Sequence, residues 1–278
     1  MMESFEILCV TMHQNDFSKI EEMNIHSNVV FANQCDHTSY EELEFEGHKA
    51  KMISTNTRGV GVNRNLALSY ATGDICLFAD DDVKYRNNME EQVRSEFEAH
   101  PDADIFIFHL DTTHPVRKQN SYPKTEKCGP LTRMPWGGVR IAFRLAAVRK
   151  SNIWFTMLFG GGAVFPSGED SIWLADAKKA GLTFYVSKET IGTVSFEESS
   201  WFTGYDENFF YGKGACSRAL HGKTFWIWKW YLIYRYRKAG NLTLDERVRW
   251  MQNGKRGYDK LLSYQDFVAE ISTAKEVK

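Results

Sequence analysis

Three consecutive carboxylates, Asp80, Asp81 and Asp82, have the clearest potential for chemistry in this 278-residue chain. Adjacent carboxylates repel one another and cost free energy unless a cation compensates their charge. Mg²⁺ and Mn²⁺ take oxygen ligands, often one or two carboxylates together with the phosphates of a substrate. Alternate side chains of an extended chain point the same way, so Asp80 and Asp82 would serve one ligand. The triplet predicts a cation and phosphate site, with a solvated acidic turn or a helix cap as the alternative.

A second acidic pair, Glu169 and Asp170, follows Gly168 and precedes a helical pattern. Acidic residues stabilise the first turn of a helix through its dipole. Ser167 and Asp170 also have the spacing of a capping box. From these residues alone, helix capping is the favoured interpretation.

Buried strands are expected to position the triplet. The apolar run at 75–79 leads directly into Asp80, and short apolar runs alternate with helical patterns through the first half of the chain. This alternation predicts βα units and a mostly parallel sheet, in which ligands bind at the carboxyl ends of the strands. We expect strands at 5–11, 28–33, 51–54, 75–79, 105–109 and 184–186, and helices at 63–71, 89–97, 170–180 and from 214 onward.

Four stretches of the chain together resemble glycosyltransferases of family 2. They are Val60–Ala67 (VGVNRNLA), Gly73–Asp82 (GDICLFADDD), Phe159–Ala163 (FGGGA) and Gly168–Asp170 (GED). Their order and spacing are similar to the family from about residue 5 to 200, and the detailed pattern resembles transferases of bacterial capsular or exopolysaccharide synthesis. The resemblance implies an α/β chain with the GT-A fold, in which helices flank a mostly parallel central sheet.

The resemblance also implies a domain organisation. A GT-A catalytic domain would span 1–213, with a nucleotide-binding half at about 1–110 and an acceptor half at about 111–213. Residues 214–278 would form a helical extension rich in aromatic and basic side chains. The proline-rich residues 112–138 are expected to form a long loop or lid.

The activity implied is an inverting transfer of a sugar from a nucleotide sugar, usually a UDP-sugar, to a glycan or a lipid-diphosphate-linked acceptor, with Mn²⁺ or Mg²⁺. Asp82 would bind the metal, and Asp80 would contact the metal or the ribose side of the nucleotide. Asp81 is expected near the nucleotide, with its role left open. Asp170 would be the general base that takes the proton of the acceptor hydroxyl. Glu169 would position Asp170 or the acceptor.

Four further residues are implied to contact the nucleotide: Thr11 and His13 after the first strand, Asn33 at the end of the second, and Arg64. The family usually has Asp where this chain has Asn33, but an amide can still pair with uracil because it both donates and accepts. A guanidinium such as that of Arg64 is suited to bidentate contact with phosphate.

The acceptor side of the cleft is implied at Gly161 and Gly162, which lie just before the second acidic pair. Trp136 could provide an apolar platform for a sugar ring. A tryptophan buried in the core is the alternative interpretation of the same residue.

The segment 225–238 reads FWIWKWYLIYRYRK, and no Asp or Glu occurs between Asn208 and Leu244. A basic helix with Trp and Tyr is typical of an interfacial membrane helix. Trp226, Trp230 and Ile233 are expected on one face, and Lys229 and Arg237 can extend toward lipid headgroups. A membrane surface across 218–238 is favoured over packing on the catalytic domain or a homodimer contact.

The composition excludes some classes of function. A net charge of −2 argues against a nucleic-acid binder driven by bulk charge. Five scattered cysteines, the absence of a visible signal peptide and the absence of a long apolar stretch predict a cytoplasmic protein, peripheral at the inner face of the cell membrane.

Two alternatives to the transferase remain open. One is a non-catalytic module that binds nucleotide sugars. The other is a nucleotidyltransferase that makes the activated sugar, although the segment 11–16 (TMHQND) lacks the glycine-rich basic loop such an enzyme would carry after its first strand.

Overall fold

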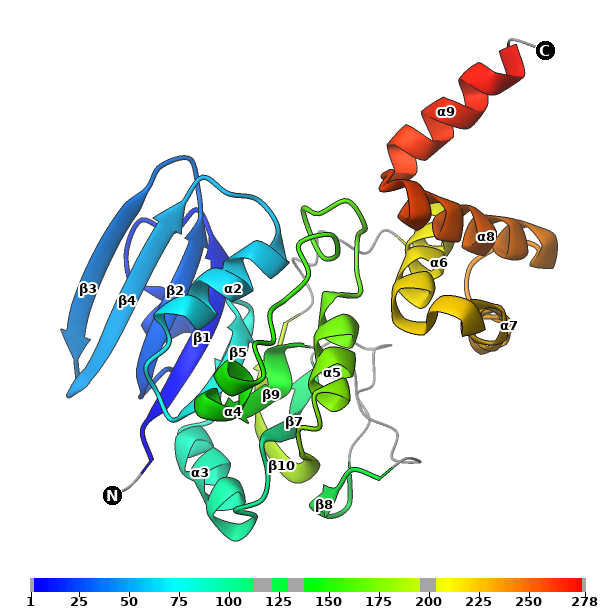
Figure 1. The fold of residues 1–278 in the computed structure, drawn as a ribbon. Coiled ribbons are helices and arrows are strands. Elements are labelled where there is room, and N and C mark those ends of the chain that lie inside the picture. The colour runs from blue at the N-terminus through cyan, green and yellow to red at the C-terminus, as the bar shows by residue number, and fades with distance from the viewer. Residues whose placement is uncertain (1–2, 113–121, 130–137, 196–203, 277–278) are drawn as a thin grey trace. The chain divides into compact units, whose positions relative to one another are not determined.

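The computed structural model describes residues 3–112, 122–129, 138–195 and 204–276, which form two compact units (Figure 1). Unit 1 comprises Met1–Arg58, Val62–Phe155 and Trp173–Glu198. Unit 2 comprises Gly59–Gly61, Thr156–Ile172 and Ser199–Lys278. The domain boundary expected at residue 213 falls inside unit 2.

Unit 1 is built on a mixed sheet. Its strands are β1 (Phe5–Met12), β2 (Asn28–Gln34), β3 (Ser39–Phe45), β4 (His48–Thr55), β5 (Ile75–Asp80), β6 (Val83–Tyr85), β7 (Ile105–Thr112), β8 (Glu126–Lys127), β9 (Ile141–Arg144) and β10 (Phe184–Val194). Their order is β3-β4-β2-β1-β5-β9-β7-β10-β6, and β8 pairs with β10. Strands β4, β2, β1 and β5 run parallel, so their carboxyl ends lie at one edge.

The strands of this parallel part are apolar on both faces because both faces are buried. Ile7, Val29 and Leu77 are fully buried in the core of unit 1. Around the sheet lie α1 (Lys19–Glu22), α3 (Met89–Ala99), α4 (Leu145–Lys150) and the short 3₁₀ helix η1 (Gly138–Arg140). Helices α2 (Val60–Tyr70) and α5 (Glu169–Lys179) have residues in both units.

Several strands were not expected from the sequence. In β3, Glu41, Glu42 and Glu44 are exposed at the edge of the sheet, where charged side chains oppose pairing with another chain. Strand β9 has four residues and inserts antiparallel between β5 and β7. Strand β10 continues to Val194 through a register shift between Val186 and Thr190, where polar side chains interrupt the apolar run.

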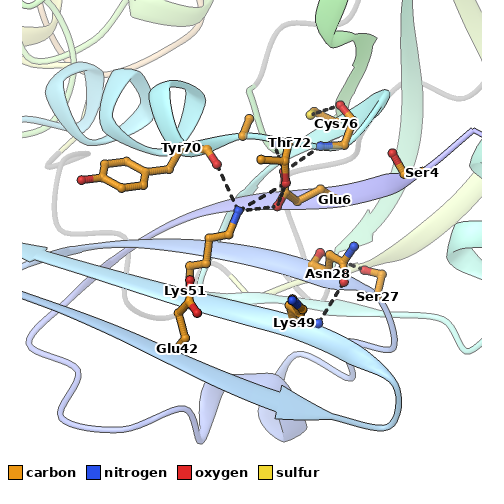
Figure 2. Close-up of polar contacts among 12 residues, drawn as sticks. Ser4, Glu6, Ser27, Asn28, Glu42, Lys49, Lys51, Tyr70, Thr72 and Cys76 are labelled. Atoms are coloured by element: carbon orange, nitrogen blue, oxygen red, sulfur yellow. Dashed lines mark hydrogen bonds and ion pairs between the residues drawn. The ribbon is translucent and has the colours of Figure 1, made fainter.

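The amino ends of the parallel strands are joined by a buried carboxylate, that of Glu6 (Figure 2). It accepts hydrogen bonds from the main-chain N–H groups of Thr72 and Gly73 and from the Thr72 hydroxyl. The Lys51 ammonium lies 3.6 Å from Glu6 Oε1 and donates to the Tyr70 carbonyl. A Cβ at Gly73 would lie 2.7 Å from the Glu6 Cβ, so only glycine fits there. This network fixes the end of α2 against β1 and β4.

Unit 2 is mainly helical. Its elements are α6 (Glu207–His221), the 3₁₀ helix η2 (Gly222–Thr224), α7 (Phe225–Arg235), α8 (Leu244–Lys260) and α9 (Tyr264–Glu276). The backbones of α6 and α8 pack closely at two glycines. A Cβ at Gly214 would lie 2.2 Å from the Met251 carbonyl oxygen, and a Cβ at Gly254 would lie 1.9 Å from the Tyr211 carbonyl oxygen, so the close contact requires glycine at both positions. The helical part expected from residue 214 thus begins earlier, at Glu207, where Asp206 caps α6.

Candidate active site

The acidic triplet lies at the carboxyl edge of the parallel strands in unit 1. Strand β5 ends at Asp80, and Asp81 and Asp82 form a turn that leads into β6. The side-chain alternation of an extended chain, which the sequence suggested for Asp80 and Asp82, therefore does not continue through the triplet. The turn is fixed by Ser195, whose main-chain N–H donates to the Asp82 carbonyl.

The strand register brings other predicted residues to the same edge. Thr11 in β1 lies opposite Asn33 in β2, and Asn33 lies opposite Ser54 in β4. On the other side of β1, Val10 lies opposite Asp80 in β5. Residues far apart in the chain therefore form one polar row beside the triplet.

Neighbouring side chains hold the carboxylates of Asp81 and Asp80. The Thr11 hydroxyl donates to Asp81 Oδ2. Arg64 Nη2 donates to Asp80 Oδ1 over 3.0 Å, and the Arg64 guanidinium carbon lies 5.2 Å from the centre of the Phe155 ring. Arg64 is 3% exposed and Asp80 is 38% exposed. Arg64, which was expected to contact a phosphate, is thus buried and donates a hydrogen bond to the partly exposed Asp80.

The start of helix α2 is fixed by Asn65. Asn65 exchanges two hydrogen bonds with the main chain of Phe155, at 2.9 Å and 2.7 Å. Asn63 is buried one turn into the helix. These contacts hold Arg64 in the orientation that reaches Asp80.

Asn33 is fully buried, and its amide is engaged inside the protein. Its oxygen accepts from the Gln14 N–H at 3.0 Å, and its nitrogen donates to the Gln14 carbonyl and to the Ser54 hydroxyl, both at 2.9 Å. The amide expected to pair with a base thus orients the segment after β1. His13 in that segment has a φ of 55° and donates its main-chain N–H to the Gln34 carbonyl. Its side chain is exposed at this corner of the sheet.

The grouped negative charge acts on buried side chains below it. Burial raises the pKa of the Cys9 thiol well above its ordinary value, and the charges of Asp81 and Asp80 raise it further. Burial also raises the pKa of the Tyr85 hydroxyl, with added contributions from Cys9, Asp80 and Asp82. A divalent cation would offset this charge, and the carboxylate oxygens of Asp80 and Asp82 are the donors that Mg²⁺ and Mn²⁺ prefer. The residues present therefore fit such a metal.

The second acidic pair begins α5 in unit 2. Glu169 is 9% exposed, and its Oε2 accepts the Gly168 N–H at 3.0 Å. A Cβ at Gly160, where φ is 108°, would lie 3.0 Å from the Glu169 Cδ and 2.3 Å from the Val60 Cγ1. The glycine is thus required for the close approach of Glu169 and Val60. Asp170, the next residue, is half-buried in the first turn of the helix.

The glycine loop before this pair meets the start of α2. The Val60 N–H donates to the Gly161 carbonyl at 3.0 Å, and a Cβ at Gly162 would lie 3.2 Å from the Gly59 nitrogen. Among the described residues, no heavy atom lies within 4 Å of the position that a Cβ on Gly161 would take. Unit 2 therefore brings the predicted residues Gly161, Gly162 and Glu169 together. Trp136, the predicted sugar platform, lies outside the described residues.

The sequence did not point to one further group at the end of β2. Potential metal ligands of Cys35, Asp36 and His37 lie within 4.8 Å of one another. Cys35 Sγ contacts the His37 carbonyl at 3.3 Å, the Cys35 N–H donates to the Thr55 carbonyl, and Asp36 and His37 are exposed. We interpret these three consecutive residues as a hydrogen-bonded turn.

Comparisons with known proteins show which family and which fold the chain resembles. Residues 29–158 match the sequence model of Glycosyl transferase family 2. Residues 1–349 of TarS from S. aureus superpose with a TM-score of 0.56 at 13% identity, over 94% of this chain and 93% of that one. Its complexes with UDP-GlcNAc (TM-score 0.57, 13% identity) and with UDP (0.58, 12% identity) cover the same shares. No curated protein sequence matches the chain.

At this identity the likeness to TarS shows the fold, and it confirms the expected GT-A type of α/β architecture. The matched segment contains Asn33, Arg64 and the acidic triplet, and it ends before Glu169. Residues 29–158 are thus similar in sequence to Glycosyl transferase family 2, and the chain is similar in fold to TarS.

Proposed function

We propose that the chain transfers a sugar from a UDP-sugar to an acceptor hydroxyl, with inversion at the anomeric carbon. The observation that supports this proposal most is the fixed acidic edge of unit 1, where Arg64 donates to Asp80 and Thr11 donates to Asp81. Arg64 and the acidic triplet lie within the segment that matches the family model. A uridine nucleotide as donor is supported by TarS, whose structures include complexes with UDP-GlcNAc and UDP.

In this proposal Asp80 and Asp82 hold Mn²⁺ or Mg²⁺. When bound, the cation would neutralise the negative charge of the departing diphosphate. The contribution of the protein is to keep the ligands in place: the buried Arg64 fixes Asp80, and the Ser195 N–H fixes the turn at Asp82. Thr11 keeps the Asp81 carboxylate directed at β1.

Asp170 acts as the general base. It takes the proton of the acceptor hydroxyl while the acceptor oxygen forms its bond to the anomeric carbon and the bond from that carbon to the diphosphate oxygen breaks. UDP leaves, and no covalent enzyme intermediate forms. Glu169 is the positioning residue, because the Gly168 N–H and the close approach at Gly160 fix its carboxylate. The acceptor is a glycan or a lipid-diphosphate-linked glycan.

A panel of UDP-, GDP- and dTDP-sugars with Mn²⁺ tests this function through the nucleotide diphosphate released. We expect release of UDP from UDP-sugars only, and a loss of about a hundredfold or more in Asp170→Asn while the donor still binds. Glu44→Gln, an exposed change on β3, is the matched control and should keep full turnover.

Two results would contradict the proposal. Binding of UDP-sugars without turnover under all conditions would make the chain a binding module. A response confined to GDP- or dTDP-sugars would exclude the uridine donor.

A further inference from the structure

The outer face of α7 in unit 2 is an exposed apolar surface. Positions 226, 230 and 234 repeat every four residues, and positions 227 and 231 lie beside them, so their side chains form one continuous stripe. The side chains are 46% to 65% exposed, and they are Trp226, Ile227, Trp230, Tyr231 and Tyr234. Contiguous apolar surface of this kind marks an interaction site.

The opposite face of α7 is packed. Phe225 and Ile233 are 5% and 3% exposed and lie in the interior of unit 2. Ile233 follows Trp226 by two helical turns, but Ile233 is buried while Trp226 and Trp230 are exposed. Position 233 lies at the border of the stripe, and the structure turns it inward while Tyr234 takes the outer place. Packing in the interior of unit 2 accounts for the apolar residues on one face of α7. The apolar stripe on the outer face is not covered by any of the described residues.

A buried arginine anchors the end of α7. Arg247 is 6% exposed and donates from Nη1 to the Tyr236 carbonyl and from Nη2 to the Ala239 carbonyl, both at 3.0 Å. Cations stabilise the carbonyl end of a helix in this way. The Arg247 guanidinium also lies over the Phe210 ring. The apolar stripe is therefore displayed by a helix that is fixed to the core of unit 2.

Basic side chains border the stripe. The Lys229 ammonium lies 5.0 Å from the centre of the Trp230 ring, and the Arg237 guanidinium 4.1 Å from that of Tyr234. Arg235 Nη1 donates to the Tyr231 hydroxyl at 3.2 Å. No Asp or Glu occurs between Asn208 and Leu244 in the sequence, so the charged side chains that this segment contributes to the rim of the stripe are basic. A negatively charged surface complements it.

We propose that the outer face of α7 binds the surface of an anionic membrane, with the helix lying in the plane of the lipid headgroups. Trp and Tyr prefer this level of a bilayer, and Lys and Arg are attracted to anionic lipids. A second copy of the chain would bring one positive rim against another, which opposes pairing of two such faces.

The helix lies on the bilayer and does not enter it. With 11 residues, α7 is about 16 Å long, against about 30 Å of hydrocarbon to be crossed. None of the helices in the described residues has the length and apolar character that a crossing requires. Trp226, Trp230 and Tyr234 would reach the boundary between headgroups and acyl chains.

Vesicle flotation with the full chain tests this proposal. The protein should float with vesicles of phosphatidylcholine containing about one third phosphatidylglycerol, and much less with phosphatidylcholine alone. The double variant Trp226→Ser/Trp230→Ser should lower the bound fraction about tenfold or more. Trp154→Ser is the matched control, because Trp154 is 45% exposed and lies in unit 1. Circular dichroism must show that each variant is folded.

A charge variant separates the two contributions. Arg235→Gln/Arg237→Gln should reduce binding to anionic vesicles toward the level seen with phosphatidylcholine, and added salt should do the same to the unchanged chain. The proposal is overturned if the chain fails to float with anionic vesicles, or if the folded tryptophan variant floats as well as the parent. It is also overturned if sedimentation without lipid shows a dimer that the tryptophan variant dissociates.

Discussion

Carboxylates lie at both ends of the parallel strands in unit 1, and the two groups differ in their burial and in their hydrogen bonds. At the amino ends, Glu6 is 2% exposed, accepts hydrogen bonds from two main-chain N–H groups and a hydroxyl, and forms an ion pair with Lys51 (Figure 2). At the carboxyl ends, three adjacent carboxylates are gathered and Asp80 is 38% exposed. The first arrangement joins strands and a helix, and the second concentrates charge where a ligand can neutralise it. Four predictions test this contrast.

The largest expected effect is on turnover at the carboxyl edge. Asp82→Asn should lower kcat/KM on the order of a hundredfold or more, because a ligand of the metal is lost. The same change removes like-charge repulsion, so the free energy of unfolding should stay the same or rise. Steady-state kinetics and urea unfolding of one preparation measure both. A stability loss that accounts for the missing activity would contradict the contrast.

The amino edge should show the opposite response. Glu6→Gln leaves Lys51 without its buried counter-charge and weakens the bonds from Thr72 and Gly73, so unfolding should become easier by about 3 kcal/mol. Urea unfolding measures this change. Below the unfolding transition kcat/KM should remain within about twofold of the parent value, because a substitution in the buried interior lowers activity through the fraction of folded protein. Lost turnover at full stability would show that this edge serves the reaction.

An intermediate effect is expected at Arg64. Arg64→Lys keeps the positive charge but loses the planar guanidinium that reaches Asp80 while stacking on Phe155. Residues that orient a metal ligand typically affect metal affinity by about 10- to 100-fold. Mn²⁺ titration by calorimetry should show such a weakening. An unchanged Mn²⁺ affinity would remove Asp80 from the metal site.

The smallest effect concerns Asp74, at the amino end of β5. Hydrogen bonds from the Ser4 N–H and hydroxyl lower the pKa of the Asp74 carboxyl. A lowered pKa contributes stability that is present above the unfolded value of about 3.9 and is lost as the pH falls through the folded value. Asp74→Asn should therefore be less stable at neutral pH and lose less on acidification below pH of about 4. Urea midpoints of both proteins across this range test the sign.

The sequence predicted the central strands because their apolar runs are buried on both faces, as in β1, β2 and β5. It did not predict β3, whose glutamates are typical of a surface segment, or β9, whose four residues acquire their pairing only between β5 and β7. The local sequence pattern predicts which segments are buried. The insertion of a short strand into a sheet depends on contacts between residues that are distant in the sequence.

The candidate site shows the same limit. The acidic triplet and the family resemblance predicted a nucleotide and metal site at Asp80, Arg64 and Thr11. The register of β1 and β5 brings Thr11 and Asp80 to one edge, and Arg64 in α2 donates to Asp80. The pairing of Arg64 with Asp80 and of Asn33 with the Gln14 main chain could not be predicted, because each joins segments that meet only in the fold. In α7 likewise, the helical spacing predicted which residues share a face, but it did not show which face packs against unit 2.

The most direct test of the contrast is calorimetric titration of UDP into the full chain, with and without Mn²⁺, for the parent and Asp82→Asn. We predict that the parent binds UDP in the presence of Mn²⁺ and much more weakly in its absence, and that Asp82→Asn loses the Mn²⁺-dependent part. Equal binding of UDP by both proteins, with or without Mn²⁺, would contradict the assignment of the acidic edge to the metal and the diphosphate.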